Sequence, residues 1–220
     1  PGPLTVLLPR SARVPDEVTG GRASVGLRVP AHPMTLELIR RTGPLAAPSA
    51  NRFGAISPTT AEHVAADLGD LLDPARDVIL DGGPSPIGVE STIVDFCSGR
   101  PQVLRAGGIP VEQVEQLLGD PLAAAAGPSR ASGMLASHYA PRCPVVLVDD
   151  RAAAERELVD RPGAVILDRT DDVAAYASDL YAFLRRADAD CAACVIAVLP
   201  PAAGLGHAIR DRLTKAAAPR

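Results

Sequence analysis

Polar residues lie where a Gly/Pro-rich loop leads into an apolar strand near the middle of the chain. Residues 81–95 have the sequence DGGPSPIGVESTIVD, and the run that begins at Thr92 has the composition of a buried strand. Glu90 and Ser91 lie at the point where loop becomes strand. Binding groups concentrate at such points because a rigid element positions them there. We therefore predict that polar groups among Glu90, Ser91 and Thr92 belong to a binding site.

An arginine followed closely by two glycines comes soon after this strand. Arg105 is separated by one alanine from Gly107 and Gly108. A guanidinium group offers a fork of hydrogen-bond donors to an anion, and glycines let backbone N–H groups approach closely. This pattern predicts that Arg105 binds an anion. A structural pairing of Arg105 with Asp95 or Glu90 is the alternative.

A third polar loop lies upstream, at residues 47–52, with the sequence APSANR. It precedes Ser57 and Pro58, which we predict as the N-cap and the first residue of a helix. A hydroxyl-rich loop that ends at a helix N-terminus can bind a phosphate or a carboxylate. Such loops are also common as plain turns. Three polar loops at element boundaries of one domain favour a site.

These loops are positioned by elements that hydrophobic periodicity and turn residues predict. Strands and helices mix without strict alternation before residue 122, which favours an α/β domain with a mixed sheet. The expected strands are 4–8, 24–29, 78–80, 91–96 and 102–105, and the expected helices are 34–41, 60–68 and 111–118.

Residues 123–142 are predicted to be a linker because Gly, Ser and Pro are frequent there. Met134, His138 and Tyr139 give this linker apolar and amphipathic side chains that could bury against another surface. One hypothesis is that the linker closes over a site in the first domain. The alternative is that these side chains pack on the second domain.

Residues 143–220 alternate regularly between strand and helix patterns. The expected strands are 145–148, 164–167 and 194–199, and the expected helices are 151–159, 172–187 and 205–217. This alternation predicts a small, Rossmann-like parallel sheet. No Gly-x-Gly-x-x-Gly turn follows the first strand, so we predict no dinucleotide site.

Composition limits the classes of function. The chain has 220 residues and a net charge of −4, so no overall positive field attracts nucleic acid. Four cysteines without a disulfide-framework spacing, and no apolar run of membrane length, favour a cytoplasmic protein without a membrane segment. Cys191 and Cys194 have redox spacing, but we predict that they are small core residues and that no metal is bound.

These motifs together resemble the threonylcarbamoyl-AMP synthase family, whose catalytic part is a YrdC-like domain. The resemblance runs in order over nearly the whole chain. The motifs are PGPLT at 1–5, SVGLRVP at 24–30, PSAN at 48–51, SPTT at 57–60, GVESTIVD at 88–95, LRAGGI at 104–109, GMLASHYAP at 133–141 and GLGHAIRDRL at 204–213.

The resemblance implies an α/β fold in two parts. Residues 1–122 would form an N-terminally truncated YrdC-like domain, a mixed twisted sheet with helices. Residues 143–220 would form the small Rossmann-like domain of the longer, two-domain members. The family carries further strands and a Lys/Arg-containing motif ahead of the segment that matches Pro1. We therefore expect this chain as given to make little or no product.

The implied activity is that of a nucleotidyltransferase, which makes threonylcarbamoyl-AMP and pyrophosphate from L-threonine, bicarbonate and ATP. ATP is expected with Mg²⁺, and a downstream tRNA-modifying transferase complex would use the product. The resemblance assigns no catalytic residue and no metal ligand. It implies ATP-binding roles for Ser24, Ser49, Ser57, Arg105 and Tyr139, and threonine-binding roles for Arg28, Ala47 (through its backbone) and Ser91.

Alternatives remain open at this stage. Arg28 could be a surface cation, and Ser91 could be an ordinary strand-end hydroxyl. The alternative function is a non-catalytic protein that keeps part of the pocket and binds RNA or a protein partner. Net acidity predicts that any RNA binding is weak.

Overall fold

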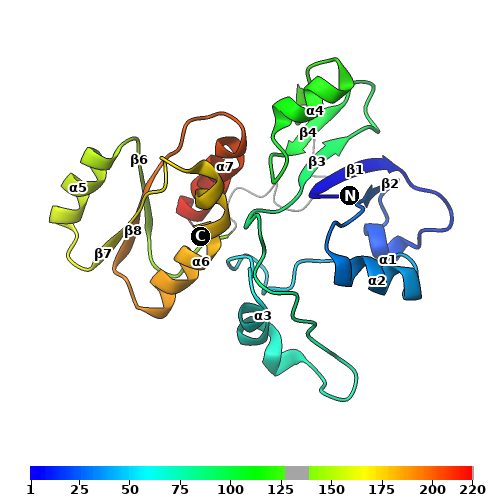
Figure 1. The fold of residues 1–220 in the computed structure, drawn as a ribbon, viewed down its shortest axis with the longest axis horizontal. Coiled ribbons are helices and arrows are strands. Elements are labelled where there is room, and N and C mark those ends of the chain that lie inside the picture. Colours follow the sequence, from blue (N-terminus) through cyan, green and yellow to red (C-terminus); the bar gives the residue numbers. More distant parts are fainter. Residues whose placement is uncertain (127–138, 220) are drawn as a thin grey trace. The chain divides into compact units, whose positions relative to one another are not determined.

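The structure, a computed structural model, describes residues 1–126 and 139–219. The chain forms two compact units, each built from two segments (Figure 1). Unit 1 comprises Pro1–Pro48 and Glu90–Met134, and unit 2 comprises Ser49–Val89 and Leu135–Arg220. The domain boundaries expected at residues 122 and 143 stay a prediction. Most of the predicted linker, including Met134 and His138, lies outside the described residues.

Unit 1 is built on a five-stranded mixed sheet, which confirms the predicted sheet type. Its strands are β1 (Leu4–Pro9), β2 (Ser24–Leu27), β3 (Thr92–Asp95), β4 (Gln102–Arg105) and β5 (Ala123–Ala124), in the order β2-β1-β3-β4-β5. β1 and β3 are parallel, with Leu4 opposite Thr92, whereas β2 and β4 run antiparallel to their neighbours β1 and β3. All four residues of the central strand β3 are buried.

The described residues of unit 1 form three helices: α1 (Asp16–Thr19), α2 (Pro33–Thr42) and α4 (Val111–Leu118). Proline at the start favours α2, because its missing N–H would have no partner in the first turn. Glycine at φ 76° ends α4. Leu7, Ile93 and Leu104, one from each of the three neighbouring strands β1, β3 and β4, form a buried apolar cluster.

Unit 2 contains a three-stranded parallel sheet, as the strand–helix alternation predicted. The strands β6 (Val145–Val148), β7 (Ala164–Leu167) and β8 (Cys194–Val198) have the order β6-β8-β7. The helices α5 (Arg151–Asp160), α6 (Val173–Ala189) and α7 (Leu205–Ala217) cover the sheet, α5 on one side and α6 and α7 on the other (Figure 1). Alternate residues of β8 pack with Ala154 of α5, so both faces of the central strand are buried.

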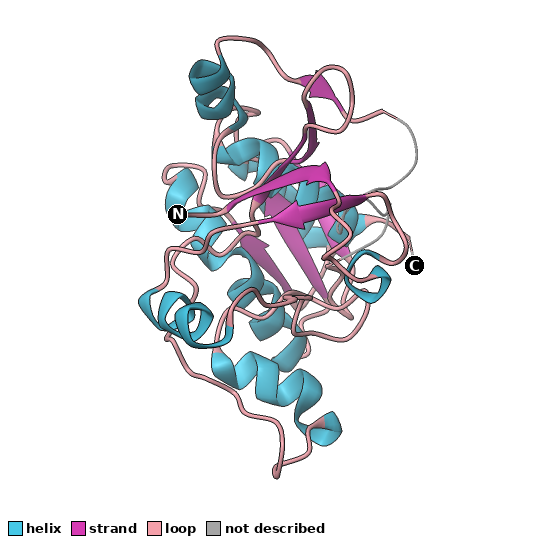
Figure 2. Ribbon diagram, turned by 90° about the vertical axis from the view of Figure 1, so that its right-hand side faces the viewer, coloured by secondary structure: helices cyan, strands magenta, loops and turns pink. Residues whose placement is uncertain are grey.

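The segment 49–89 of unit 2 contains one helix, α3 (Ala61–Leu68), and the short 3-10 turn η1 (Gly69–Leu71). Loops, drawn pink in Figure 2, connect the regular elements of the chain. The expected strand at 78–80 is wrong, because these residues form no strand and the side chain of Val78 is 77% exposed. The prediction rested on apolar composition alone. That composition favours a strand only where the side chains pack against neighbouring strands, and the exposed Val78 does not.

The predicted start of this helix is also wrong. Thr60, not Ser57, is the N-cap, and its Oγ1 accepts a hydrogen bond from the backbone N–H of His63 at 3.3 Å. Pro58 therefore lies outside the helix. Both Ser57 and Thr60 have the side chain of a good N-cap, and the backbone path into the helix selects the second.

The two cysteines with redox spacing differ in burial. Cys194 is 4% exposed within β8, as predicted, whereas the core prediction for Cys191 is wrong because that residue is exposed in a turn at φ 53°. Within residues 1–126 and 139–219, no cluster of three or more His, Cys, Asp or Glu side chains could hold a metal ion. No helix in that same part of the chain is long and apolar enough to cross a membrane.

Candidate functional site

Ser91 lies directly before β3 in unit 1 and is 5% exposed. Its Oγ is 2.7 Å from Oγ1 of Thr5, which lies on β1. Arg105, at the end of β4, donates from Nε and Nη2 to the backbone carbonyl of Ser91, at 3.1 and 3.0 Å. Its Nη2 also donates to Ser91 Oγ at 3.2 Å. We call Thr5, Ser91 and Arg105 the Ser91 cluster, and it joins a residue predicted for ATP to one predicted for threonine.

The β3–β4 hairpin brings Arg105 beside Ser91. Asp95, the last residue of β3, is fully buried, and its carboxylate accepts hydrogen bonds from Cys97 N at 2.8 Å and from Ser98 Oγ at 3.0 Å. These bonds stabilise the turn between the two strands. The antiparallel register then places Arg105 opposite Ile93, two residues after Ser91. Local turn chemistry therefore determines the position of the guanidinium group.

The glycines after Arg105 allow two backbone segments to approach closely. A Cβ atom on Gly107 would lie 2.3 Å from the carbonyl oxygen of Glu90 and 2.4 Å from Thr92 N. Gly108 N donates to that same Glu90 oxygen at 2.8 Å. Thr92 Oγ1 donates to Ile109 O at 2.5 Å and accepts from Ile109 N at 3.0 Å. The close contact between these segments therefore supports the backbone on both sides of Ser91.

Three further predicted site residues belong to unit 1. Ser24 begins β2, is half-buried and pairs with Pro9 in the sheet. Arg28 follows β2 and is exposed, so the guanidinium group is accessible to solvent. Ala47 is exposed in the loop after α2. Their predicted contacts with ATP or threonine stay predictions.

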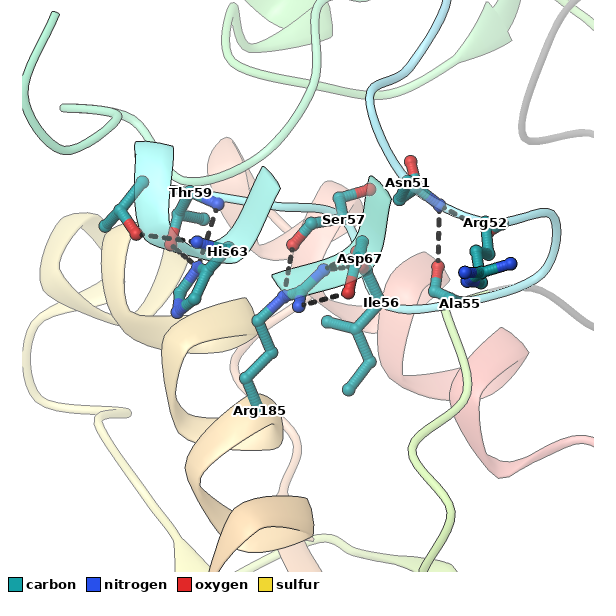
Figure 3. A network of polar contacts seen from close by, with 10 residues as sticks. Asn51, Arg52, Ala55, Ile56, Ser57, Thr59, His63, Asp67 and Arg185 are labelled. Atoms are coloured by element: carbon teal, nitrogen blue, oxygen red, sulfur yellow. Dashed lines mark hydrogen bonds and ion pairs between the residues drawn. The ribbon is translucent and has the colours of Figure 1, made fainter. Parts of the chain in front are cut away.

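Ser57 belongs to unit 2, where an arginine of α6 fixes its backbone (Figure 3). Arg185 donates from Nε to the carbonyl of Ser57 at 3.2 Å and from Nη2 to the carbonyl of Ile56. The same guanidinium group forms a two-pronged ion pair with Asp67 of α3, with N···O distances of 3.0 and 2.5 Å. We call Ile56, Ser57, Asp67 and Arg185 the Ser57 cluster. Ser49, the other predicted ATP residue of this segment, is exposed.

A neutral histidine lies beside this cluster. His63 Nδ1 accepts a hydrogen bond from Thr59 N at 3.2 Å (Figure 3). Burial lowers the pKa of His63, and the positive charge of Arg185 lowers this pKa further. The carbonyl of Thr59 in turn accepts from Ser85 N at 2.8 Å. The uncharged imidazole ring therefore stabilises the loop that leads into α3.

Asn51 folds the turn ahead of Ser57. Its Nδ2 donates to the carbonyls of Arg52 and Ala55, at 2.9 and 3.1 Å (Figure 3). Its Oδ1 is buried and has no hydrogen-bond partner among the described residues. Arg52 is exposed and forms an ion pair with Asp70 at 2.7 Å. These hydrogen bonds and the ion pair fix the conformation of the turn.

Tyr139 is buried in unit 2, with 2% of its surface exposed. Its ring centre lies 5.5 Å from that of Tyr181 on α6, and the guanidinium carbon of Arg212 on α7 lies 5.3 Å from its ring centre. Tyr139 has φ 63°, an uncommon value for a residue with a side chain. The ring therefore packs on the helices that follow it in the chain, as the alternative interpretation of the linker expected. Its predicted contact with ATP stays a prediction.

Both parts of the chain resemble proteins of one family. Residues 1–107 match a family model described as "Telomere recombination", and residues 109–218 match one described as "Threonylcarbamoyl-AMP synthase, C-terminal domain". The chain is 35% identical to the threonylcarbamoyl-AMP synthase of Pyrococcus abyssi, over 98% of this chain and 70% of that protein. The identity to the enzyme of Bacillus subtilis is 37%, over 100% of this chain and 71% of that protein.

The chain belongs to the threonylcarbamoyl-AMP synthase family. The solved structure of P. abyssi Sua5 complexed with L-threonine has a TM-score of 0.89 and 35% identity, and the match covers 99% of this chain and 71% of that one. A variant of that protein with a histidine and a tyrosine changed to alanine has a TM-score of 0.88 and 34% identity, covering 99% and 70%. The α/β fold and the family membership predicted from the motifs are therefore confirmed.

Sequence reasoning missed several residues that shape this site in the new family member. Arg185 and Asp67 gave no signal, because their partners lie more than a hundred residues away along the chain. Thr5 gave only the signal of the motif in which it lies. Gly88 was part of a recognised motif, yet its role as a close contact with α6 was not foreseen: a Cβ there would lie 2.2 Å from Ala177 O.

Proposed function

We propose that this protein makes threonylcarbamoyl-AMP from L-threonine, bicarbonate and ATP, with release of pyrophosphate. Two threonylcarbamoyl-AMP synthases match the chain over 98–100% of its length, which supports this activity. The P. abyssi relative has been solved with L-threonine, which supports the amino-acid substrate. The protein is thus a nucleotidyltransferase-type enzyme by family.

The structure of the product defines what the active site must bind and stabilise. Threonylcarbamoyl-AMP is a mixed anhydride of a carbamate and a phosphate, and its formation at the α-phosphorus of ATP displaces pyrophosphate. A carbamoylated amino acid with two negative charges must approach a polyanionic triphosphate. Positive charges and fixed N–H donors lower the energy of that approach, because they act where negative charge gathers in the transition state.

The contact between Ser91 and Arg105 is the observation that carries the proposal. In our assignment the Ser91 hydroxyl contacts threonine and the Arg105 guanidinium contacts ATP phosphate oxygens. The two groups are 3.2 Å apart, so ligands bound to them would be direct neighbours. Bringing two reactants together in this way converts a collision between solutes into a step within one complex.

The remaining assignments complete the proposed site. Ser24, Ser49, Ser57 and Tyr139 would contact ATP, and Arg28 and the Ala47 carbonyl would contact threonine. Mg²⁺ would accompany the triphosphate through phosphate oxygens and water. A tRNA-modifying transferase complex would consume the product in the cytoplasm, because a reactive anhydride has a useful lifetime only where its acceptor is close.

The decisive experiment is an assay of pyrophosphate release with ATP, L-threonine and bicarbonate, each omitted in turn. The protein is assayed as residues 1–220 and, where the gene encodes residues upstream of Pro1, with these included. We expect at least one of these forms to release pyrophosphate in dependence on all three substrates and to give a product with the mass of threonylcarbamoyl-AMP. Pyrophosphate release that continues without threonine, or the absence of the product from every form of the protein, would refute the proposal.

Tyr139 has its own test, because its hydroxyl can be removed while its ring is kept. Tyr139→Phe keeps the ring against Tyr181 and Arg212 and removes only the hydroxyl. If the hydroxyl contacts ATP, this variant weakens ATP binding. Equal ATP affinity in Tyr139→Phe and wild type would remove Tyr139 from the nucleotide site.

A further inference from the structure

Helix α6 lies in the part of the chain that matches the C-terminal family model, and it contacts the segment that carries Ser57. Figure 3 shows Arg185 extending from α6 toward Asp67 and the carbonyl side of Ile56 and Ser57. We propose that Arg185 is a positioning residue for ATP binding, acting through the backbone of Ser57. This inference rests on the proposed function, in which Ser57 contacts ATP.

The geometry of the guanidinium group favours a positioning role. Nη1 and Nη2 meet the two carboxylate oxygens of Asp67, while Nε and Nη2 donate to the carbonyls of Ser57 and Ile56. One rigid, planar group thus fixes α3 and the loop ahead of it in a single arrangement. A lysine carries the same charge on a flexible chain, and it cannot make these contacts together.

Burial makes the arrangement sensitive to loss of the arginine. The side chains of Arg185 and Asp67 are only 14% and 17% exposed. Removing the cation would leave the Asp67 carboxylate and two backbone carbonyls partly shielded from water without their donor. Such uncompensated groups are relieved by movement of the segment toward water. The position of the Ser57 hydroxyl would change with that movement.

Helix α6 makes a second contact with the segment 49–89, near the C-terminal end of that segment. Gly88 packs so closely on the α6 backbone that an added Cβ would lie 2.2 Å from Ala177 O and 2.5 Å from the Cα of Ser178. Ser178 precedes Arg185 by seven residues, which is two helical turns, so both contacts lie on one side of α6. The helix therefore contacts the segment near both of its ends. Gly88 is also three residues before Ser91 in the sequence.

In this proposal α6 has a structural role in ATP binding. α6 supplies no group to the substrates in this proposal. It sets the backbone of the loop that presents Ser57, so that the hydroxyl does not have to be ordered when ATP arrives. Pre-ordering of a binding loop raises affinity because less conformational entropy is lost on binding. Loss of this pre-ordering should lower the affinity for ATP and leave the affinity for threonine largely unchanged.

The test compares Arg185→Gln and Arg185→Lys with Arg186→Gln in the full chain. Arg186 is the next residue of α6, is exposed and stacks over Phe183 at 5.9 Å, so its variant has the same charge change without contact to the loop. ATP binding is measured by titration calorimetry, and the KM values for ATP and threonine are measured by pyrophosphate release. Val198→Ala serves as a stability control, because Val198 packs in the core of the sheet beside α5.

We expect Arg185→Gln to weaken ATP binding about tenfold, the scale of a lost charge-assisted hydrogen bond, with the threonine KM within about twofold of wild type. Arg185→Lys should recover little of the loss, and Arg186→Gln should match wild type. Unchanged ATP affinity in Arg185→Gln would overturn the inference. So would an equal loss of ATP affinity in Val198→Ala, because general destabilisation would then explain the effect.

The calorimetric measurement separates this inference from the proposed function. If wild type binds ATP but releases no threonine-dependent pyrophosphate, the proposed function fails and the ATP titrations of the variants still decide the role of Arg185. If wild type binds no ATP at all, both are overturned.

Discussion

Two arginines in this protein make the same contact in different settings. Arg105 donates to the backbone carbonyl of Ser91 in unit 1, and Arg185 donates to the backbone carbonyl of Ser57 in unit 2. Each serine is predicted to bind a substrate. The first contact spans 14 residues across one hairpin, whereas the second spans 128 residues and connects a helix to a loop.

The two clusters therefore depend on different parts of the fold. The Ser91 cluster needs the β3–β4 hairpin and the neighbouring strand β1, which carries Thr5, so its geometry forms together with the sheet. The Ser57 cluster needs the packing of α6 against a segment that is mostly loop, and a half-buried ion pair between Arg185 and Asp67 fixes that segment. We therefore expect the first cluster to be robust and the second to depend on the surroundings.

We expect the largest loss of unfolding free energy from a substitution of Gly88, which packs on α6 in the segment that carries Ser57. Gly88→Ala places a side chain at φ 76° and 2.2 Å from Ala177 O, so backbone strain and a clash add together. We expect a loss of about 3–5 kcal/mol in unfolding free energy. Gly83→Ala is the matched control, since Gly83 has φ 79° with open space around it and should lose only about 1 kcal/mol. Urea denaturation compares them, and similar losses for both variants would contradict the close contact.

Gly107→Ala is the corresponding change on the Ser91 side. Here no backbone strain applies, but the added Cβ would lie 2.3–2.4 Å from backbone atoms of residues 90–92. We expect a loss of about 2–4 kcal/mol in unfolding free energy and a clear loss of threonine affinity, because the backbone of Ser91 must move. Gly99→Ala, in the hairpin turn with open space, should behave as wild type. A stable Gly107→Ala protein with normal threonine binding would show that Ser91 does not need this support.

Arg105→Ala sharpens the comparison through its effect on two ligands. Loss of the guanidinium group should weaken ATP binding by roughly 1.5–3 kcal/mol, the scale of a charge-assisted hydrogen bond. Threonine affinity should fall as well, because Ser91 loses three hydrogen bonds from Arg105. Arg185→Gln, in contrast, should affect ATP alone. Calorimetric titration with each ligand measures the difference, and unchanged ATP affinity would exclude Arg105 from the phosphate site.

The smallest expected effect is a pH dependence at His63. The pKa of His63 is lowered from 6.5 by burial and by Arg185, while Asp67 and Glu62 oppose the shift. Between pH 6.5 and the lowered pKa, the unfolded chain binds the proton more readily than the folded one. Stability is therefore complete above pH 6.5, falls as the pH drops through this window, and levels off below it. Acid would weaken the Thr59 contact because a protonated Nδ1 cannot accept a hydrogen bond.

His63→Gln removes the titrating ring and keeps a polar side chain. Urea denaturation of both proteins from pH 8 to 5 measures the effect, and we expect a smaller loss of stability on acidification in the variant. Identical pH profiles would show that the protonation of His63 is not linked to folding.

The sequence by itself determined most of the regular structure. The pattern of strands and helices after residue 143 agrees with the observed elements within two residues, because short continuous apolar runs mark the strands of a sheet that is covered on both faces. The sequence also indicated Ser91 and Arg105 as site residues, but the structural partners it suggested for Arg105 were Asp95 and Glu90, whereas Arg105 donates to Ser91. A strand boundary, a hairpin turn and a glycine pair all act over short distances along the chain, so their residues indicate the site without determining its contacts.

The contacts of Arg185, the burial of Tyr139 and the irregular backbone at Val78 became visible in the folded protein alone. Arg185 and Arg186 are equivalent in the sequence, yet one points at a buried carboxylate and the other is exposed. Which of the two meets Asp67 depends on how α6 packs on a segment more than a hundred residues earlier. The physical reason is that an ion pair between distant residues leaves no periodic pattern in the sequence, because it is selected by the fold as a whole.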